Sequence, residues 1–176
     1  MKRLAIFILT VGLFTGGAPL FSMRGNSSAL AQEDITAHSS CSYCGMDRQK
    51  YAHSRVFIEF DDGYTLGTCS IHCAAVDLAV HIDKTPVKIQ VGDYGTKELI
   101  DAETAFWVIG GNNMGVMTTR AKWAFGTKES AAAYIQANGG SPAEFDAVME
   151  AAYEDMYKDT KMIREKRKMK HQMKKS

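Results

Sequence analysis

The first half of the chain alternates apolar and polar positions in a way that predicts two strands, a helix and a third strand. Residues 55–60 are rich in β-branched and aromatic side chains, and Asp61-Asp62-Gly63 is a turn signal before a second strand over residues 64–68. Residues 69–82 then carry apolar side chains at helical spacing, and residues 86–91 predict another strand. The helical positions are Ile71, Ala74, Ala75, Leu78 and Ile82.

The second half repeats this order of elements. Residues 103–109 predict a strand that ends at the Gly/Asn-rich residues 110–113, and residues 122–125 predict a short strand. Thr127 is a typical N-cap for a helix over residues 128–137, which Asn138-Gly139-Gly140 would end. The halves share no convincing sequence identity, so the repeat is a prediction about structure alone.

A longer helix is predicted at the C-terminus. Ser141-Pro142-Ala143-Glu144 has the pattern of a capping box with proline at the first helical position. The apolar positions of the helix that follows are Phe145, Val148, Met149, Ala152 and Met156. We therefore predict an α+β fold, with two similar ββαβ halves in one compact domain plus a C-terminal helical extension. Residues 32–40 are polar without periodicity and predict a flexible leader.

The N-terminus has the pattern of a secretory signal peptide. Lys2 and Arg3 precede an apolar run over residues 4–14, and a small-residue site, Ala29-Leu30-Ala31, follows. We expect residues 1–31 to be the signal and the protein to be periplasmic. A segment that is not cleaved would instead anchor the chain to the membrane.

Charge is divided unevenly along the remaining sequence. Residues 32–160 carry 10 Lys and Arg against 19 Asp and Glu, a net of −9, whereas residues 161–176 carry 8 against 1, a net of +7. Such a basic tail would dock on its own acidic body, on a partner, or peripherally on anionic lipid; a fraying solvated helix end is the alternative. We expect no nucleic-acid partner.

All four cysteines lie in two tight clusters. The first is Cys41-Ser-Tyr-Cys44-Gly-Met46, and the second is Cys69-Ser-Ile-His72-Cys73. Residues at i, i+3 and i+4 share one face of a helix, so Cys69, His72 and Cys73 would chelate a metal together if Cys69 opens the predicted helix. Thiolates with one imidazole suit zinc, whereas thiolates with thioethers favour Cu(I).

Two methionines favour copper over zinc. Met46 follows Cys44 directly after a glycine, and Met114 follows a Gly/Asn-rich loop, where packing in a core explains a methionine less well than it would inside a helix. Met117, in the same loop, is explained equally well by core packing. We expect Cu(I) at Cys44, Met46 and Met114, with the remaining cysteines and His72 forming an adjoining site or an entry path.

Three alternatives use the same cysteines. A zinc-stabilised binding module would be held by the Cys41/Cys44/Cys69/His72/Cys73 cluster. Structural disulfides are common in exported chains, although pairs this close in sequence would close small loops. A thiol–disulfide oxidoreductase is disfavoured because no strand pattern precedes Cys41 and Gly45 opposes a helix start there. We predict no catalytic residue and no enzymatic activity.

At Cys44-Gly45-Met46 the sequence resembles the NosL family, accessory proteins of nitrous oxide reductase maturation. The hairpin around Asp62-Gly63, the Asn113-Met114-Gly115 loop and the Trp123-Ala124-Phe125 strand before a helix follow the order of that family. The resemblance implies an α+β fold of two ββαβ halves and, as copper ligands, Cys44, Met46 and Met114.

The resemblance also implies a function and partners. The protein would bind Cu(I) outside the cytoplasm and deliver it, as a copper chaperone, to an apo-cuproenzyme such as nitrous oxide reductase or to a component of the maturation transporter. On this interpretation residues 32–140 are a NosL-like metal-binding domain, and residues 141–176 are a C-terminal helix with a basic tail.

Overall fold

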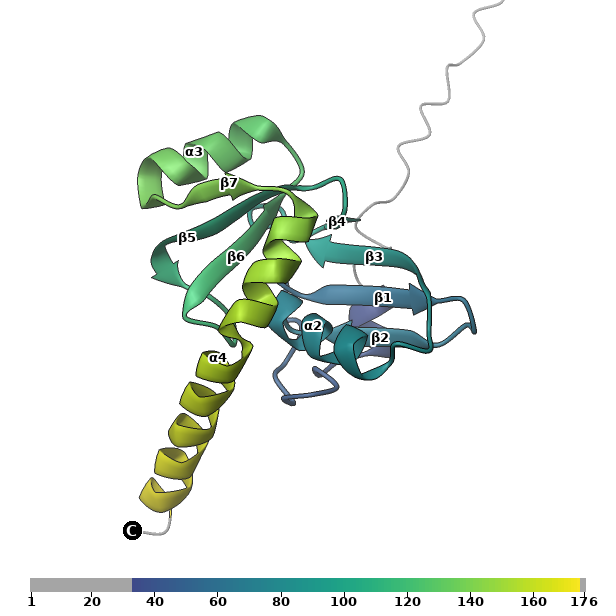
Figure 1. Ribbon diagram of the computed structural model, residues 1–176, viewed down its shortest axis with the longest axis vertical. Coiled ribbons are helices and arrows are strands. Elements are labelled where there is room, and N and C mark those ends of the chain that lie inside the picture. The colour runs from purple at the N-terminus through teal and green to yellow at the C-terminus, as the bar shows by residue number, and fades with distance from the viewer. Residues whose placement is uncertain (1–32, 175–176) are drawn as a thin grey trace, which may run out of the picture.

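The first half of the fold is a four-stranded antiparallel sheet with one helix. The computed structural model describes residues 33–174 (Figure 1). The strands occur in the order β2-β1-β3-β4, so the first strand is central. The elements are β1 (Val56–Phe60), β2 (Thr65–Thr68), α2 (Ile71–Val80), β3 (Pro86–Gly92) and β4 (Leu99–Asp101).

The second half has a three-stranded antiparallel sheet, and its first strand is again central, in the order β6-β5-β7. Its helix follows the second strand as α2 does in the first half, so the prediction of two ββαβ halves with a C-terminal helix is confirmed. The elements are β5 (Phe106–Met114), β6 (Arg120–Phe125), α3 (Lys128–Asn138), β7 (Ser141–Ala143) and α4 (Phe145–Met173).

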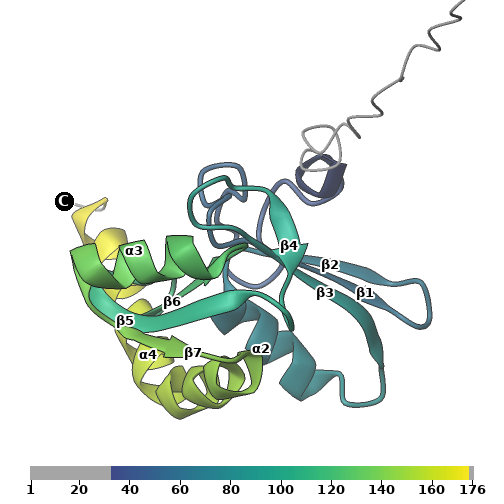
Figure 2. The same ribbon diagram turned by 90° about the horizontal axis from the view of Figure 1, so that it is seen from above.

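The second sheet separates two apolar cores. Trp107 faces the first core, which also contains β1, α2 and the start of α4, whereas the next residue, Val108, faces the second core under α3. This follows from the alternation of side chains along a strand. Figure 2 shows α3 lying along this sheet. The second core also contains three of the four cysteines, beside Trp123.

Four local predictions are wrong. The helix α2 ends at Val80, so Ile82 lies outside it and is 87% exposed. The strand β5 continues to Met114 through glycines with positive φ. The expected capping box is instead the edge strand β7, which pairs with β5 and leaves Glu144 as a helix N-cap without a side-chain bond. The leader is not flexible throughout, since residues 33–37 are helical.

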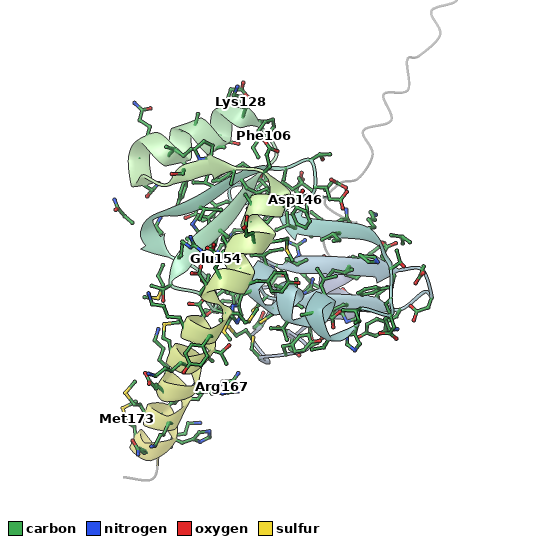
Figure 3. The ribbon with its side chains drawn as sticks, viewed as in Figure 1. Phe106, Lys128, Asp146, Glu154, Arg167 and Met173 are labelled. Atoms are coloured by element: carbon green, nitrogen blue, oxygen red, sulfur yellow. The ribbon has the colours of Figure 1, made fainter. Side chains whose placement is uncertain are left out.

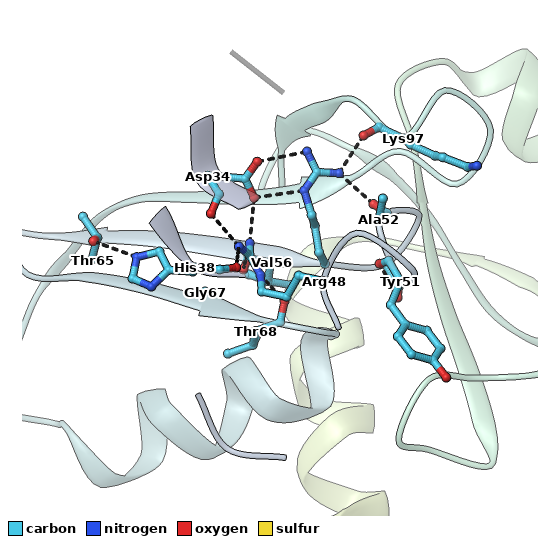
Figure 4. A network of polar contacts seen from close by, with 12 residues as sticks. Asp34, His38, Arg48, Tyr51, Ala52, Val56, Thr65, Gly67, Thr68 and Lys97 are labelled. Carbon is cyan, nitrogen blue, oxygen red and sulfur yellow. Dashed lines mark hydrogen bonds and ion pairs between the residues drawn. The ribbon is translucent and has the colours of Figure 1, made fainter. Parts of the chain in front are cut away.

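A buried carboxylate fastens that leader to the first sheet (Figure 4). Asp34 Oδ2 accepts from Arg48 Nη2 at 2.7 Å and from Arg55 Nε at 2.9 Å. Both arginine side chains are fully buried, and Asp34 is 5% exposed. The remaining Arg48 donors reach backbone carbonyls, including Thr68 O at 3.0 Å and Val56 O at 3.1 Å. Two buried guanidinium groups thus share one buried carboxylate, and backbone carbonyls accept from the remaining Arg48 donors.

Gly67 makes room for this network. A Cβ at this position would lie 2.4 Å from His38 Cβ and 2.8 Å from the guanidinium carbon of Arg48. Both distances are shorter than non-bonded carbon atoms tolerate. The strand β2 therefore needs glycine where Arg48 crosses it.

The expected signal peptide, residues 1–31, lies outside the described residues. Within residues 33–174, no helix is both long enough and apolar enough to span a bilayer.

Asp34→Asn is expected to lower the free energy of unfolding by about 3 kcal/mol, because it removes the carboxylate charge that two buried guanidinium groups share. Urea denaturation followed by circular dichroism measures the change. Glu33→Gln, at the exposed neighbouring position, is the matched control and should stay near the wild-type midpoint. Equal midpoints for the two variants would contradict the structural role of Asp34.

Candidate metal centre

The first cysteine pair lies in a tight turn. Cys41 N–H donates to Met46 O at 2.8 Å, and Gly45 N–H donates to Cys41 O at 2.9 Å. Gly45 has φ 72°, a left-handed conformation that glycine adopts without strain. This turn folds Cys44 back beside Cys41, and the thiols of these two cysteines therefore lie close together.

Both residues between these cysteines attach the turn to the first sheet and its helix. Ser42 N–H and Ser42 Oγ each donate to Gly67 O at 3.2 Å. Tyr43 OH donates to Asp77 Oδ1 at 2.5 Å, and Asp77 is a buried residue of α2. Burial and the Asp77 carboxylate raise the pKa of Tyr43, which keeps this donor protonated at neutral pH. The position of the turn relative to α2 is thereby fixed.

The second cysteine pair flanks the start of α2. Cys69 precedes the N-cap residue Ser70, and Cys73 lies in the first turn of the helix. Ser54 Oγ donates to Cys69 O at 2.8 Å, which holds the backbone at this point. The positive end of a helix dipole favours thiolates at such positions.

The two pairs converge into one four-thiol group. The Sγ atoms of Cys41, Cys44, Cys69 and Cys73 all lie within 4.8 Å of one another. The Cys44–Cys69 and Cys69–Cys73 sulfur distances are 3.4 and 3.8 Å, and all four cysteines are free thiols. Tetrahedral coordination with metal–sulfur bonds of 2.3 Å would separate sulfurs by about 3.8 Å. The group is therefore arranged to hold a soft metal ion.

The thiols differ in acidity because they hydrogen-bond to one another. Interactions with the thiols of Cys44, Cys69 and Cys73 lower the pKa of Cys41. Hydrogen bonds to Cys41 and Cys44, together with burial, raise the pKa of Cys69 and Cys73. The pKa of Cys44 is lowered as well, so Cys41 and Cys44 are the more acidic thiols of the group, whereas Cys69 and Cys73 hold protons that a metal ion must displace.

His72 is the predicted ligand that the structure does not bring to the thiol group. Its side chain is buried, and its Nδ1 lies 3.7 Å from Asp159 Oδ2 on α4. Burial lowers the pKa of His72. Because Cys69 precedes the helix, the i, i+3, i+4 pattern does not place the three side chains on one helical face.

The two predicted methionine ligands line one cavity, to which none of the four cysteines contributes, and of the two it is Met46 that packs against the cysteine-containing core. Met46 packs against the core that contains the cysteines, and Met114 is 61% exposed at the end of β5. They share an open cavity of about 340 Å³ with Met117 and His53. The residues around His53 in the sequence do not predict that it lines this cavity. The fold of the segment before β1 places His53 there.

Comparison with known proteins identifies a family. The NosL family profile matches residues 32–153. A crystal structure described as the copper chaperone NosL from Shewanella denitrificans has a similar fold, with a TM-score of 0.54 and 21% sequence identity. The superposition covers 64% of this chain and 90% of that chain. No curated protein is recognisably similar in sequence.

Cys73→Ser is expected to lower the affinity for Cd(II) by roughly tenfold or more, because it removes one of four converging thiolates. The thiolate-to-cadmium charge-transfer absorption measures binding. His72→Gln, one residue away, should bind Cd(II) as the wild type does. A comparable loss in both variants would show that His72 is a ligand and that the described thiol group is incomplete.

Binding of one Cd(II) at neutral pH should release about two protons, those of Cys69 and Cys73, because their pKa values are raised and a bound thiolate cannot keep its proton. Isothermal titration calorimetry in buffers with different ionisation enthalpies counts the protons. The apparent affinity should accordingly rise with pH. Release of no protons would contradict the assigned protonation of these thiols.

Proposed function

Because the chain belongs to the NosL family, we propose that it binds Cu(I) and delivers it to an apo-cuproenzyme. The observation that carries this proposal is the convergence of four free thiols, with Met46 packed against the same core and Met114 lining a cavity with Met46. Thiolates and thioethers are the ligands that select Cu(I) among the biological metals. The description of the structurally similar protein as a copper chaperone supports the same assignment.

The geometry also suits transfer of the metal. Three of the four cysteines are buried, whereas Cys44 is only partly buried and Met114 is open to solvent. We infer that Cys44, Met46 and Met114 form the exchanging side of the centre. The buried cysteines Cys41, Cys69 and Cys73 form the retaining side. A partner's ligands would replace the exposed ligands one at a time while the buried thiolates still hold the ion.

The proposed location rests on the signal-peptide pattern of the N-terminus, and the proposed clients rest on the resemblance to the NosL family. An exported protein would meet its acceptor in the periplasm, where nitrous oxide reductase or a component of its maturation transporter is the proposed acceptor. The basic end of α4 would add weak association with anionic lipid headgroups. No enzymatic activity is proposed, because the centre is proposed to hold a cargo and to release it unchanged.

A zinc-stabilised module is the second candidate, and one observation favours it. The Cys44–Cys69 and Cys69–Cys73 sulfur–sulfur distances, 3.4 and 3.8 Å, are close to those of a tetrahedral Zn(Cys)₄ site. Such a site would hold the turn at Cys41 against the start of α2 and stabilise the fold directly. Methionines would then have no part in metal binding.

Anaerobic Cu(I) titration against a competing chelator distinguishes the two candidates. The double variant Cys44→Ser/Met46→Leu should lose at least tenfold in Cu(I) affinity, about 1.4 kcal/mol. Met169→Leu, an exposed methionine on the outer part of α4, should bind as the wild type does.

Unchanged Cu(I) affinity in the double variant would remove the copper assignment. One tightly held zinc ion in the purified protein, whose removal unfolds the domain, would favour the zinc module instead. A transfer assay that mixes the Cu(I)-loaded chain with apo-nitrous oxide reductase tests the proposed client.

A further inference from the structure

The helix α4 is longer than the body on which it packs. It has 29 residues, which corresponds to about 44 Å of helix. Its first half contributes Val148, Ala151 and Ala152 to the interior, and its second half extends beyond the sheets (Figure 1). The family match ends at residue 153, so most of α4 lies beyond the matched residues.

Polar contacts fix the direction of this helix. Asp159 Oδ1 accepts from Thr119 N–H at 3.0 Å, in the loop between β5 and β6. One turn earlier, Asp155 Oδ2 accepts from Arg120 Nε and from Lys122 Nζ, both at 2.8 Å. The helix is thus held against the loop that begins at Met114, before its basic segment starts at residue 161.

That basic segment, residues 161–174, contacts the backbone of Cys44 in the thiol group and the side chain of Met114. Arg167 Nη2 donates to Cys44 O at 3.1 Å, and Lys166 Nζ lies 3.9 Å from Met114 Sδ. Figure 3 shows Arg167 on the outer half of α4. Cys44 is the one cysteine of the group that is not fully buried, and Met114 is 61% exposed. The cations therefore lie at the exchanging side of the centre.

The opposite charges of the metal–thiolate group and of the basic segment indicate what these contacts do. Four thiolates around one Cu(I) would carry a net charge of about −3, and around one divalent ion about −2. The rest of the body, residues 32–160, has a net charge of −9, which adds repulsion. The segment from residue 161 onward, with 8 basic residues against 1 acidic residue, brings the opposite charge to this place.

We propose that Lys166 and Arg167 are positioning residues that stabilise the metal–thiolate complex and slow the release of the ion. They act through Met114 and the backbone of Cys44 and through charge, and they do not themselves bind the metal. On this proposal the basic tail interacts with the acidic body of its own chain. This inference rests on the metal centre of the proposed function but not on the identity of the metal.

The test compares two double variants of the full chain that have the same net charge. Lys166→Gln/Arg167→Gln removes the two contacts, whereas Lys168→Gln/Lys170→Gln removes two exposed charges of the same segment that, within residues 33–174, donate no hydrogen bond to Cys44 or Met114. Each is loaded with Cd(II) and, anaerobically, with Cu(I). Stopped-flow capture by an excess of chelator measures the rate of metal release.

Release from Lys166→Gln/Arg167→Gln should be roughly two- to fivefold faster at low salt, as expected for charges near the surface. The difference should vanish near 1 M salt, where the screening length is about 3 Å. Arg167→Lys should retain most of the wild-type rate, because it keeps the charge. Equal release from the two double variants, or an effect that salt does not change, would overturn the proposal. A wild type that loads Cd(II) but not Cu(I) would instead contradict only the copper assignment.

Discussion

The arrangement of the metal centre depends on one buried carboxylate, Asp34. It forms ion pairs with both Arg48 and Arg55, whose side chains are fully buried. Arg48 follows Met46 by two residues and donates to Thr68 O, immediately before Cys69. A single guanidinium thus connects the end of the first cysteine turn with the start of the second pair. Because a buried charge must stay paired, this connection cannot slide without a large cost in free energy.

The remaining contacts convert that fixed spacing into a chelating geometry. Tyr43 connects the first turn to α2, and Ser54 holds the backbone carbonyl of Cys69. The thiols are therefore close together because of the fold, and metal binding need not assemble them. Preorganisation of this kind raises affinity by removing the entropy cost of ordering the ligands. It also means that the ligand at the surface can leave while the others keep their positions.

The helices and strands could be predicted from the sequence more completely than the geometry of the metal centre. The strand β1, the helix α3 with its Thr127 cap and the ββαβ order of both halves follow from periodicity and turn residues. The segment 141–143 fails because its capping pattern competes with a free edge of β5, which only the tertiary fold supplies. Asp34 gives no signal at all, since it lies in a polar segment without periodicity. The sequence shows the two cysteine clusters, but not that His72 turns from them toward Asp159.

The uneven distribution of charge along the chain can be read from the sequence, but the contacts that it makes cannot. The opposite signs of residues 32–160 and residues 161–176 are plain from composition. Their consequence depends on the direction of α4, which Thr119, Asp155 and Asp159 determine together. Arg167 and Cys44 are separated by 123 residues, and no local rule connects them. Once the helix is placed, the basic segment contacts the Cys44 carbonyl and the Met114 sulfur of its own chain. A segment whose composition alone suggests a lipid surface or a partner thus has its first contact with the metal centre.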